Sequence, residues 1–546
     1  MKYLLSLILM LFFTGLQAQH FTHCDTLKGS ITPLRAVYDV LHYDITIQPK
    51  IESKEIIASN KFTIKALKEF QNIQIDLFNT LTIDSITYNT TFLGFDTACN
   101  TILLQFPEVI KSGAVLSFTV FYHGAPWESL NPPWEGGWIW KNLPDESPRA
   151  EVSCEDIGAS CWLACKDHVY DEPDSVSVHI ITPDTLRGVS NGQFLGMEQY
   201  DSTAIIWHYK TTYPINSYNI TVYVADYVYF ADHIISSNRE KLILNYYVLK
   251  NNLLKAKEHF QQVKPMLTFL EAKYGAYPFI NDGFALVESI SVGMEHQSAI
   301  AYGNNYTKGY LGSDYSAMGL DFDFIIAHEM GHEWWGNLMS MNDIADMWLH
   351  EGFCTYAEKT IVDGMYGVEN GIKYINLKKR LVMNDSPILG VRNVFNKGAH
   401  LDMYTKGALM LWSIENTIND SLLWQKILTK ILKEYAYKTV AGEEIINLIV
   451  EESHQNLRPI FNTYLKYTAI PKLEYKLYSS NEGDFVKCRW ITPEKDFAMP
   501  VIFNVDDSFV WIYPNDNEQE FQLSKTNNKV ITINEDYFFF NACKKE

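Results

Sequence analysis

The chain has 546 residues, of which 47% are hydrophobic and 20% are charged, a composition typical of globular proteins. This length exceeds what one hydrophobic core supports, so we expect about three domains. The formal net charge of −20 excludes nucleic acid as an expected partner, because little positive charge is available to neutralise phosphates.

The N-terminal segment differs from the rest of the chain. Lys2 is followed by a nearly unbroken apolar run to Leu16, and Ala18 places a small residue before Gln19. The run is shorter than the roughly 20 residues that a membrane-spanning helix needs. It therefore predicts a signal peptide over residues 1–18 rather than a stable membrane anchor. We expect an exported protein, either periplasmic or extracellular.

All eight cysteines lie beyond this segment. An even number in an exported protein permits disulfides but leaves their pairing open. Cys161 and Cys165 are four positions apart, and Cys154 is close by. A structural zinc site there lacks an identifiable fourth ligand, so a disulfide or plain buried thiols are favoured.

The first long region of the mature chain has the pattern of a β domain. The stretch from Val40 to Ile47 places apolar residues at alternate positions, and Val176 to Ile181 is a later segment of strand type. Period-two patterning over some two hundred residues predicts an all-β N-terminal domain at residues 19–232.

The pattern changes near residue 250. Apolar residues from Leu253 to Leu270 recur at helical spacing, and Gly275 offers a C-cap. Two short strand patterns follow, and helical spacing then dominates until short strands return after Pro471. We therefore expect a mixed α+β domain at residues 233–470 and a small β domain at 471–546.

A metal-binding pattern begins at His328, in the order H-E-x-x-H. Residues four apart on a helix lie on nearly the same face, about 6 Å apart along the axis. His328 and His332 can therefore bind one cation, and Glu329 can reach a water on that cation. Glu351, after eighteen intervening residues, completes a His₂Glu set that leaves one position open, as in catalytic zinc sites.

Further residues fit the same pattern: Glu-Gly-Phe begins at Glu351, and Trp-Trp-Gly-Asn begins at Trp334. Together with the H-E-x-x-H motif, they resemble the aminopeptidase N and leukotriene-hydrolase family of gluzincin zinc metallopeptidases. The resemblance implies one zinc ion per chain and removal of N-terminal residues from peptides, with Glu329 as general base. It also implies an N-terminal β-saddle domain, a thermolysin-like, mostly helical catalytic domain with a small sheet, and a C-terminal small β-sandwich.

A segment ahead of the metal motif carries a possible exopeptidase signature. Gly293-Met294-Glu295-His296 resembles the family's G-x-M-E-N motif, in which the glutamate binds the free α-amino group of the substrate. Val292 and His296 depart from the usual glycine and asparagine. The resemblance assigns the amine to Glu295, with Gly293 and Met294 in the same substrate-binding segment.

Two more segments match the family in part. Glu155 lies ten residues before Cys165, and this spacing resembles a second carboxylate that contacts the amine, although Ala164 replaces the usual proline. A Y-x-K-G motif begins at Tyr404, and the resemblance implies that its hydroxyl stabilises the tetrahedral oxyanion. One such donor typically contributes about 10²–10³ in rate. Glu358 is expected to hydrogen-bond a ligand histidine.

Three other functions remain open at this point. A lipid or epoxide hydrolase can use the same scaffold, as leukotriene hydrolase does, but would not favour short peptide amides. A catalytically silent binding protein would usually have lost a metal ligand or the base, and none is lost here. A zinc endopeptidase would cleave substrates with a blocked N-terminus, whereas an exopeptidase would not.

Overall fold

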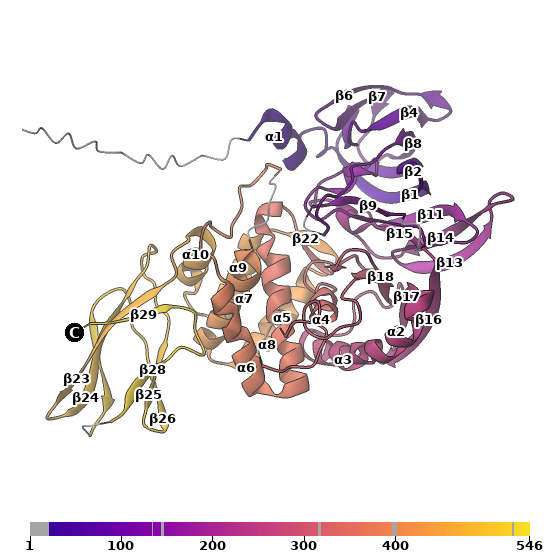
Figure 1. Cartoon of the computed structure of the whole chain (residues 1–546). Coiled ribbons are helices and arrows are strands. Elements are labelled where there is room, and N and C mark those ends of the chain that lie inside the picture. Colours follow the sequence, from indigo (N-terminus) through magenta and orange to yellow (C-terminus); the bar gives the residue numbers. More distant parts are fainter. Residues whose placement is uncertain are drawn as a thin grey trace, which may run out of the picture.

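The computed structural model describes residues 21–133, 135–142, 147–314, 318–395, 401–526 and 529–545. The expected signal peptide lies outside these residues. Three blocks lie side by side in Figure 1: N-terminal sheets, a helical middle and C-terminal sheets. This arrangement confirms the predicted multidomain fold. None of the described helices is long and apolar enough to cross a membrane.

The N-terminal block contains a large sheet in which every neighbouring pair of strands is antiparallel except β1 and β11. In spatial order its strands are β13 (Gln193–Gln199), β14 (Ala204–Thr211), β11 (Ser175–Pro183), β1 (Tyr38–Lys50), β2 (Glu55–Ala66), β8 (Val115–Gly124), β4 (Leu81–Tyr88) and β5 (Thr91–Phe92). The expected alternation holds along β1, where Tyr43, Ile45 and Ile47 are fully buried. Period-two patterning thus buries one face of the sheet and leaves the other face accessible.

Two smaller sheets complete this block. Their strands are β3 (Phe70–Asp76), β7 (Thr101–Ile110) and β6 (Gly94–Ala98) in one, and β12 (Arg187–Ser190), β15 (Val222–Ala225), β10 (Arg149–Ser153) and β9 (Gly137–Lys141) in the other. A disulfide joins Cys24, in the short helix α1 (His23–Gly29), to Cys99. Cys154 and Cys161 are free, buried thiols whose Sγ atoms lie 3.6 Å apart.

A five-stranded sheet connects the N-terminal block to the helices. Its strands are β16 (Tyr227–Ile235), β17 (Lys241–Leu249), β18 (Phe284–Glu288), β20 (Ile300–Tyr302) and β19 (Gly293–Met294). β17, β18 and β20 run parallel, and the edge strands are antiparallel. Residues 232 and 233, between which we expect the domain boundary, both lie within β16. The domain bounds stay a prediction.

Helices fill the middle block, with one parallel strand pair among them, β21 (Met339–Met341) and β22 (Lys438–Val440). The helices are α2 (Leu253–His259), α3 (Val263–Tyr274), α4 (Phe324–Gly331), α5 (Trp348–Tyr366), α6 (Val368–Leu377), α7 (Asp402–Ile418), α8 (Ser421–Glu434), α9 (Gly442–Ser453) and α10 (Arg458–Lys466). Gly275 forms the predicted C-cap of α3 with a φ of 103°, a conformation that glycine adopts without strain.

The C-terminal block consists of two small sheets. Their strands are β27 (Gln519–Ser524), β24 (Gly483–Ile491), β23 (Lys472–Ser480) and β29 (Asn541–Lys544) in one, and β26 (Ser508–Ile512), β25 (Val501–Val505) and β28 (Ile531–Asn534) in the other. Their buried residues Leu473, Trp490 and Phe503 belong to the same hydrophobic core as the helices. The C-terminal sheets therefore support the helical block directly.

Candidate active site

The helix that carries the metal motif has a defined start. Asp323 precedes α4, and its Oδ1 accepts hydrogen bonds from the backbone nitrogens of Ile325 (2.9 Å) and Ile326 (3.2 Å), which is an N-cap. Its Oδ2 accepts a hydrogen bond from the Tyr302 hydroxyl of β20 (2.8 Å). At the other end, His332 is the C-cap and keeps helical angles, with φ −64° and ψ −22°. The spacing of four residues between the histidines is therefore helical.

Three ligand atoms converge at this helix. The Nε2 atoms of His328 and His332 lie 3.3 Å apart, and the Oε2 of Glu351 lies 3.3 Å from the first and 3.5 Å from the second. Tetrahedral ligation with bonds of about 2.05 Å places ligand atoms about 3.3 Å apart. All three residues are buried, at 7%, 1% and 1% exposure. The cluster therefore fits one tetrahedral metal ion with a position left open.

Glycines bring α5 and α7 together beside this cluster. Glu351 lies in the first turn of α5 and Gly352 follows it. A Cβ added to Gly352 would lie 3.3 Å from the Cα of Gly407, in α7, which is tighter than ordinary van der Waals contact. This close approach holds Tyr404 at the site, with its ring centroid 5.8 Å from that of His328.

The outer nitrogens of both histidines have hydrogen-bond acceptors. The Nδ1 of His328 lies 2.8 Å from Glu358 Oε1, and the Nδ1 of His332 lies 3.0 Å from Trp335 O. Because a carboxylate and a carbonyl only accept, each Nδ1 carries the proton and each Nε2 presents its lone pair to the cluster. The Nζ of Lys378 lies 2.6 Å from the other oxygen of Glu358. The expected hydrogen bond between Glu358 and one of the two histidines is confirmed.

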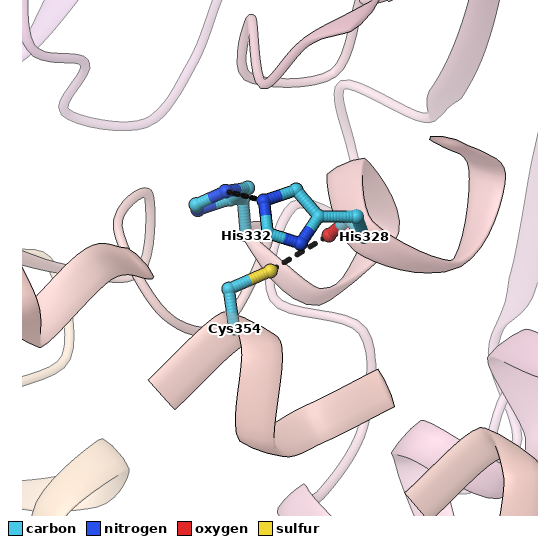
Figure 2. Close-up of side chains that lie close together, drawn as sticks. All are labelled: His328, His332 and Cys354. Carbon is cyan, nitrogen blue, oxygen red and sulfur yellow. Dashed lines mark hydrogen bonds between the residues drawn. The ribbon is translucent and has the colours of Figure 1, made fainter. Parts of the chain in front are cut away.

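Cys354, one turn beyond Glu351, also lies beside the two histidines (Figure 2). Its thiol donates a hydrogen bond to the backbone carbonyl of His328 (2.7 Å). Because that thiol already has a partner and both Nε2 atoms face Glu351, the His₂Glu set is the better metal site. Sequence reasoning missed this cysteine, although its helical spacing from Glu351 places both side chains on one face.

The predicted site residues share one cavity of about 600 Å³. It is lined by His328, His332, Glu351, Glu329, Tyr404, Glu295, Gly293, Met294 and Glu155. Asp156 lines it too, and sequence reasoning did not single it out, although it directly follows Glu155. Residues from β19, α4, α5, α7 and the loop after β10 thus meet at one place.

Glu329 lies against the backbone of β19. A Cβ added to Gly293 would lie 2.4 Å from Glu329 Oε1, so a glycine there makes room for the carboxylate. Burial raises the pKa of Glu329 to about 7, against the opposing attraction of His328 and His332. A buried carboxyl with such a pKa can exchange a proton near neutral pH.

Two further carboxylates lie close to the metal cluster. Oxygens of Glu155, Glu295 and Glu351 lie within 4.8 Å of one another. Burial raises the pKa of both Glu295 and Glu155, and the negative charge of neighbouring carboxylates raises both further. The Tyr218 hydroxyl donates to Glu295 (3.1 Å), whereas Glu155 Oε1 is buried and has no hydrogen-bond partner among the described residues. This arrangement favours a cationic group in the cavity.

The structure explains why His296 can stand where the G-x-M-E-N motif has asparagine. The Nδ1 of His296 lies 2.5 Å from the hydroxyl of Tyr223, and the residue does not line the cavity. The amide nitrogen of Asn337, from the Trp-Trp-Gly-Asn segment, donates to the backbone carbonyl of Glu295 (2.9 Å). The backbone at Glu295 is thus held by a residue that follows the metal motif.

The three-block fold and the His₂Glu cluster define a multidomain protein of the H-E-x-x-H metal-binding class. Residues 258–464 match the model of the peptidase family M1 domain. The chain is 24% identical over 317 residues to aminopeptidase Q of Acinonyx jubatus, covering 53% of this chain and 31% of that protein. With aminopeptidase 2 of Candida albicans it is 19% identical over 534 residues, covering 92% and 55%.

The fold is similar to that of an M1 zinc metallopeptidase from Deinococcus radiodurans, solved with a Tyr-Ser-Ala substrate. The TM-score is 0.66 at 18% identity, and the match covers 81% of this chain and 97% of that one. The chain is thus similar to peptidases of the M1 family over residues 258–464, and its fold is similar to that of an M1 metallopeptidase. The matched parts cover 31% and 55% of the length of the two aminopeptidases named above.

Proposed function

We propose that this protein is a zinc-dependent aminopeptidase that releases N-terminal residues from peptides. The observation that carries the proposal is the convergence of the His328, His332 and Glu351 ligand atoms in the cavity that also holds Glu295 and Glu155. A metal site beside two carboxylates that lack a cationic partner suits a substrate with a free ammonium group at fixed distance from its scissile carbonyl.

The donor set suits one zinc ion per chain, since two imidazoles and one carboxylate are ligands of catalytic zinc. A zinc ion held there supplies Lewis-acid chemistry to the scissile carbonyl and to the attacking water. Glu358 and Trp335 O fix the ring orientations of His328 and His332.

The remaining steps belong to side chains of the cavity. Glu329 takes a proton from the attacking water and returns it to the departing amine, for which a pKa near neutrality is suited. Burial, together with the negative charge of Glu351, raises the pKa of Tyr404 well above its ordinary value. Tyr404 therefore keeps its proton and donates a hydrogen bond to the oxyanion as negative charge develops.

Recognition of the terminus rests on the carboxylates. Glu295 binds the α-ammonium group of the substrate, and Glu155 Oε1 supplies a second acceptor. Met294 and Gly293 form the adjacent wall of the cavity. Acetylation of the substrate removes the positive charge and leaves these carboxylates without a cationic partner, which is costly.

The test compares aminoacyl-p-nitroanilides with and without an N-acetyl group, using wild type and Glu329→Gln. Cleavage of the free-amine set alone, lost in the variant and on chelation, supports the proposal. Equal cleavage of the acetylated set would make the protein an endopeptidase. An absence of cleavage by zinc-loaded protein would refute the peptidase proposal in favour of the lipid-hydrolase or silent-scaffold alternatives.

We also propose that the protein is exported after cleavage behind Ala18. The disulfide between Cys24 and Cys99 supports this, because such bonds persist in oxidising compartments. Expression of the full sequence in a bacterial host, followed by N-terminal sequencing of the fractionated protein, tests it. A cytoplasmic protein that retains residues 1–18 would refute it.

A further inference from the structure

A second cluster of metal-ligating side chains lies on the accessible face of the eight-stranded sheet. β13, β14, β11 and β1 lie next to one another there (Figure 1). His179 of β11 and His208 of β14 are directly opposite residues of an antiparallel pair. Their Nδ1 atoms lie 2.6 Å apart, and their ring planes cross at 68°. The two imidazoles thus meet edge to edge through their nitrogens.

Each imidazole has a carboxylate near its other nitrogen. The Nε2 of His179 lies 3.0 Å from Asp44 Oδ1 of β1, and the Nε2 of His208 lies 3.8 Å from Glu198 Oε1 of β13. Asp44 lies within hydrogen-bond distance and favours a proton on His179 Nε2, whereas Glu198 lies beyond that distance and acts on His208 only through its charge. The two Nδ1 atoms, 2.6 Å apart, either share one proton or both present lone pairs, and in the second case they repel unless a cation lies between them.

We propose that His179 and His208 bind one divalent transition-metal ion of the Cu²⁺ type through their Nδ1 atoms. A carboxylate–histidine–metal arrangement is common at protein metal sites, and Asp44 and His179 supply the carboxylate and the histidine of one. The imidazole side chains are 26% and 25% exposed, so the ion can enter and water can complete its coordination. This site would be separate from the His₂Glu cluster of the helical block.

The geometry favours copper over zinc. Two nitrogens bound at about 2.05 Å with a right angle between them lie about 2.9 Å apart, and Cu²⁺ prefers this square arrangement. Tetrahedral zinc needs about 3.3 Å. The Nδ1–Nδ1 distance of 2.6 Å is closer to the copper value. The two rings therefore move apart less to bind copper than to bind zinc. The divalent series also places Cu²⁺ above Zn²⁺ in affinity for nitrogen ligands.

The sheet offers a matched control on the same face. His42 of β1 lies one sheet position from Asp44, and its Nδ1 lies 2.8 Å from the hydroxyl of Ser175. No described histidine faces it in the way that His208 faces His179. Substitution of His42 therefore removes a half-buried imidazole from the same face and leaves His179, His208 and Asp44 in place.

The experiment titrates the full mature protein, loaded with zinc, with Cu²⁺ and measures bound copper after equilibrium dialysis. Wild type and His42→Gln are expected to bind one more copper ion than His179→Gln and His208→Gln. The copper resonance spectrum of that ion should show two imidazole nitrogens. Asp44→Asn should weaken the site by about 10–100-fold, the usual effect of losing such a carboxylate.

Two results would overturn the proposal. If His208→Gln binds as many copper ions as wild type, or retains the two-nitrogen signal, the pair holds only a shared proton. Copper can also displace zinc from the His₂Glu cluster. This happens equally in all variants, so it does not change the difference in bound copper between them. Unfolding curves without copper show whether each variant is folded, and the glutamine variants keep polar side chains on an accessible face.

Discussion

Replacing Glu358 by Gln separates two roles of one buried carboxylate. One oxygen lies 2.8 Å from His328 Nδ1, and the other accepts from the Tyr374 hydroxyl (2.7 Å) and from Lys378 Nζ (2.6 Å). A glutamine oxygen can still accept the hydrogen bond from His328 Nδ1, but it carries no negative charge. Loss of such a carboxylate lowers metal affinity by about 10–100-fold, or about 1.4–2.7 kcal/mol.

The same substitution removes the carboxylate partner of a buried ammonium group. Lys378 is 2% exposed, and breaking a buried ion pair on one side costs about 3–5 kcal/mol of stability. Replacing Lys378 by Met in the same chain should recover most of that stability. It should leave zinc affinity low, because the charged hydrogen bond to His328 is still missing.

The assay combines chelator competition for zinc with denaturant unfolding of the metal-free protein. Glu415→Gln is a matched control, because Glu415 also accepts a hydrogen bond from a tyrosine, Tyr356 (2.5 Å), but does not line the cavity. Zinc affinity in Glu358→Gln within twofold of wild type, with reduced stability, would refute the reasoning. Glu358 would then serve only as a counter-ion to Lys378.

Three further outcomes follow from the same structure. Tyr404→Phe should lower kcat by about 10²–10³ with KM little changed, and near-wild-type kcat would contradict the oxyanion role. Glu295→Gln should raise KM for free-amine substrates and lower the ratio of their kcat/KM to that of acetylated substrates. An unchanged ratio would count against amine binding by Glu295. Burial lowers the pKa of His168 from 6.5 to about 4. Between pH 4 and 6.5, His168 is therefore protonated in the unfolded chain and neutral in the folded protein. Stability should therefore fall as the pH drops from 6.5, by up to about 1.4 kcal/mol per unit, and a His168→Gln variant with the same pH slope in urea unfolding would refute this.

The metal cluster was predictable because its geometry is mostly local. A helix fixes the relation of His328 to His332, and the first turn of helix α5 supplies Glu351. The supporting contacts were harder to foresee. Tyr218 reaches Glu295 across 77 positions of sequence, and His179 meets His208 only because the strand register places them opposite. Such contacts depend on tertiary packing, which periodicity does not encode.

The glycines of the motifs show why the matches were informative. In Gly-Met-Glu, Gly293 leaves room for Glu329, since a Cβ there would lie 2.4 Å from its carboxylate. Gly352 and Gly407 let the backbones of α5 and α7 touch, with a Cβ on Gly407 only 3.1 Å from Gly352 Cα. Each glycine is thus needed for a reactive group on a different element to reach the cavity. A motif that pairs a reactive residue with such a glycine therefore constrains the packing of two elements at once. Such a motif occurs by chance much more rarely than the reactive residue alone.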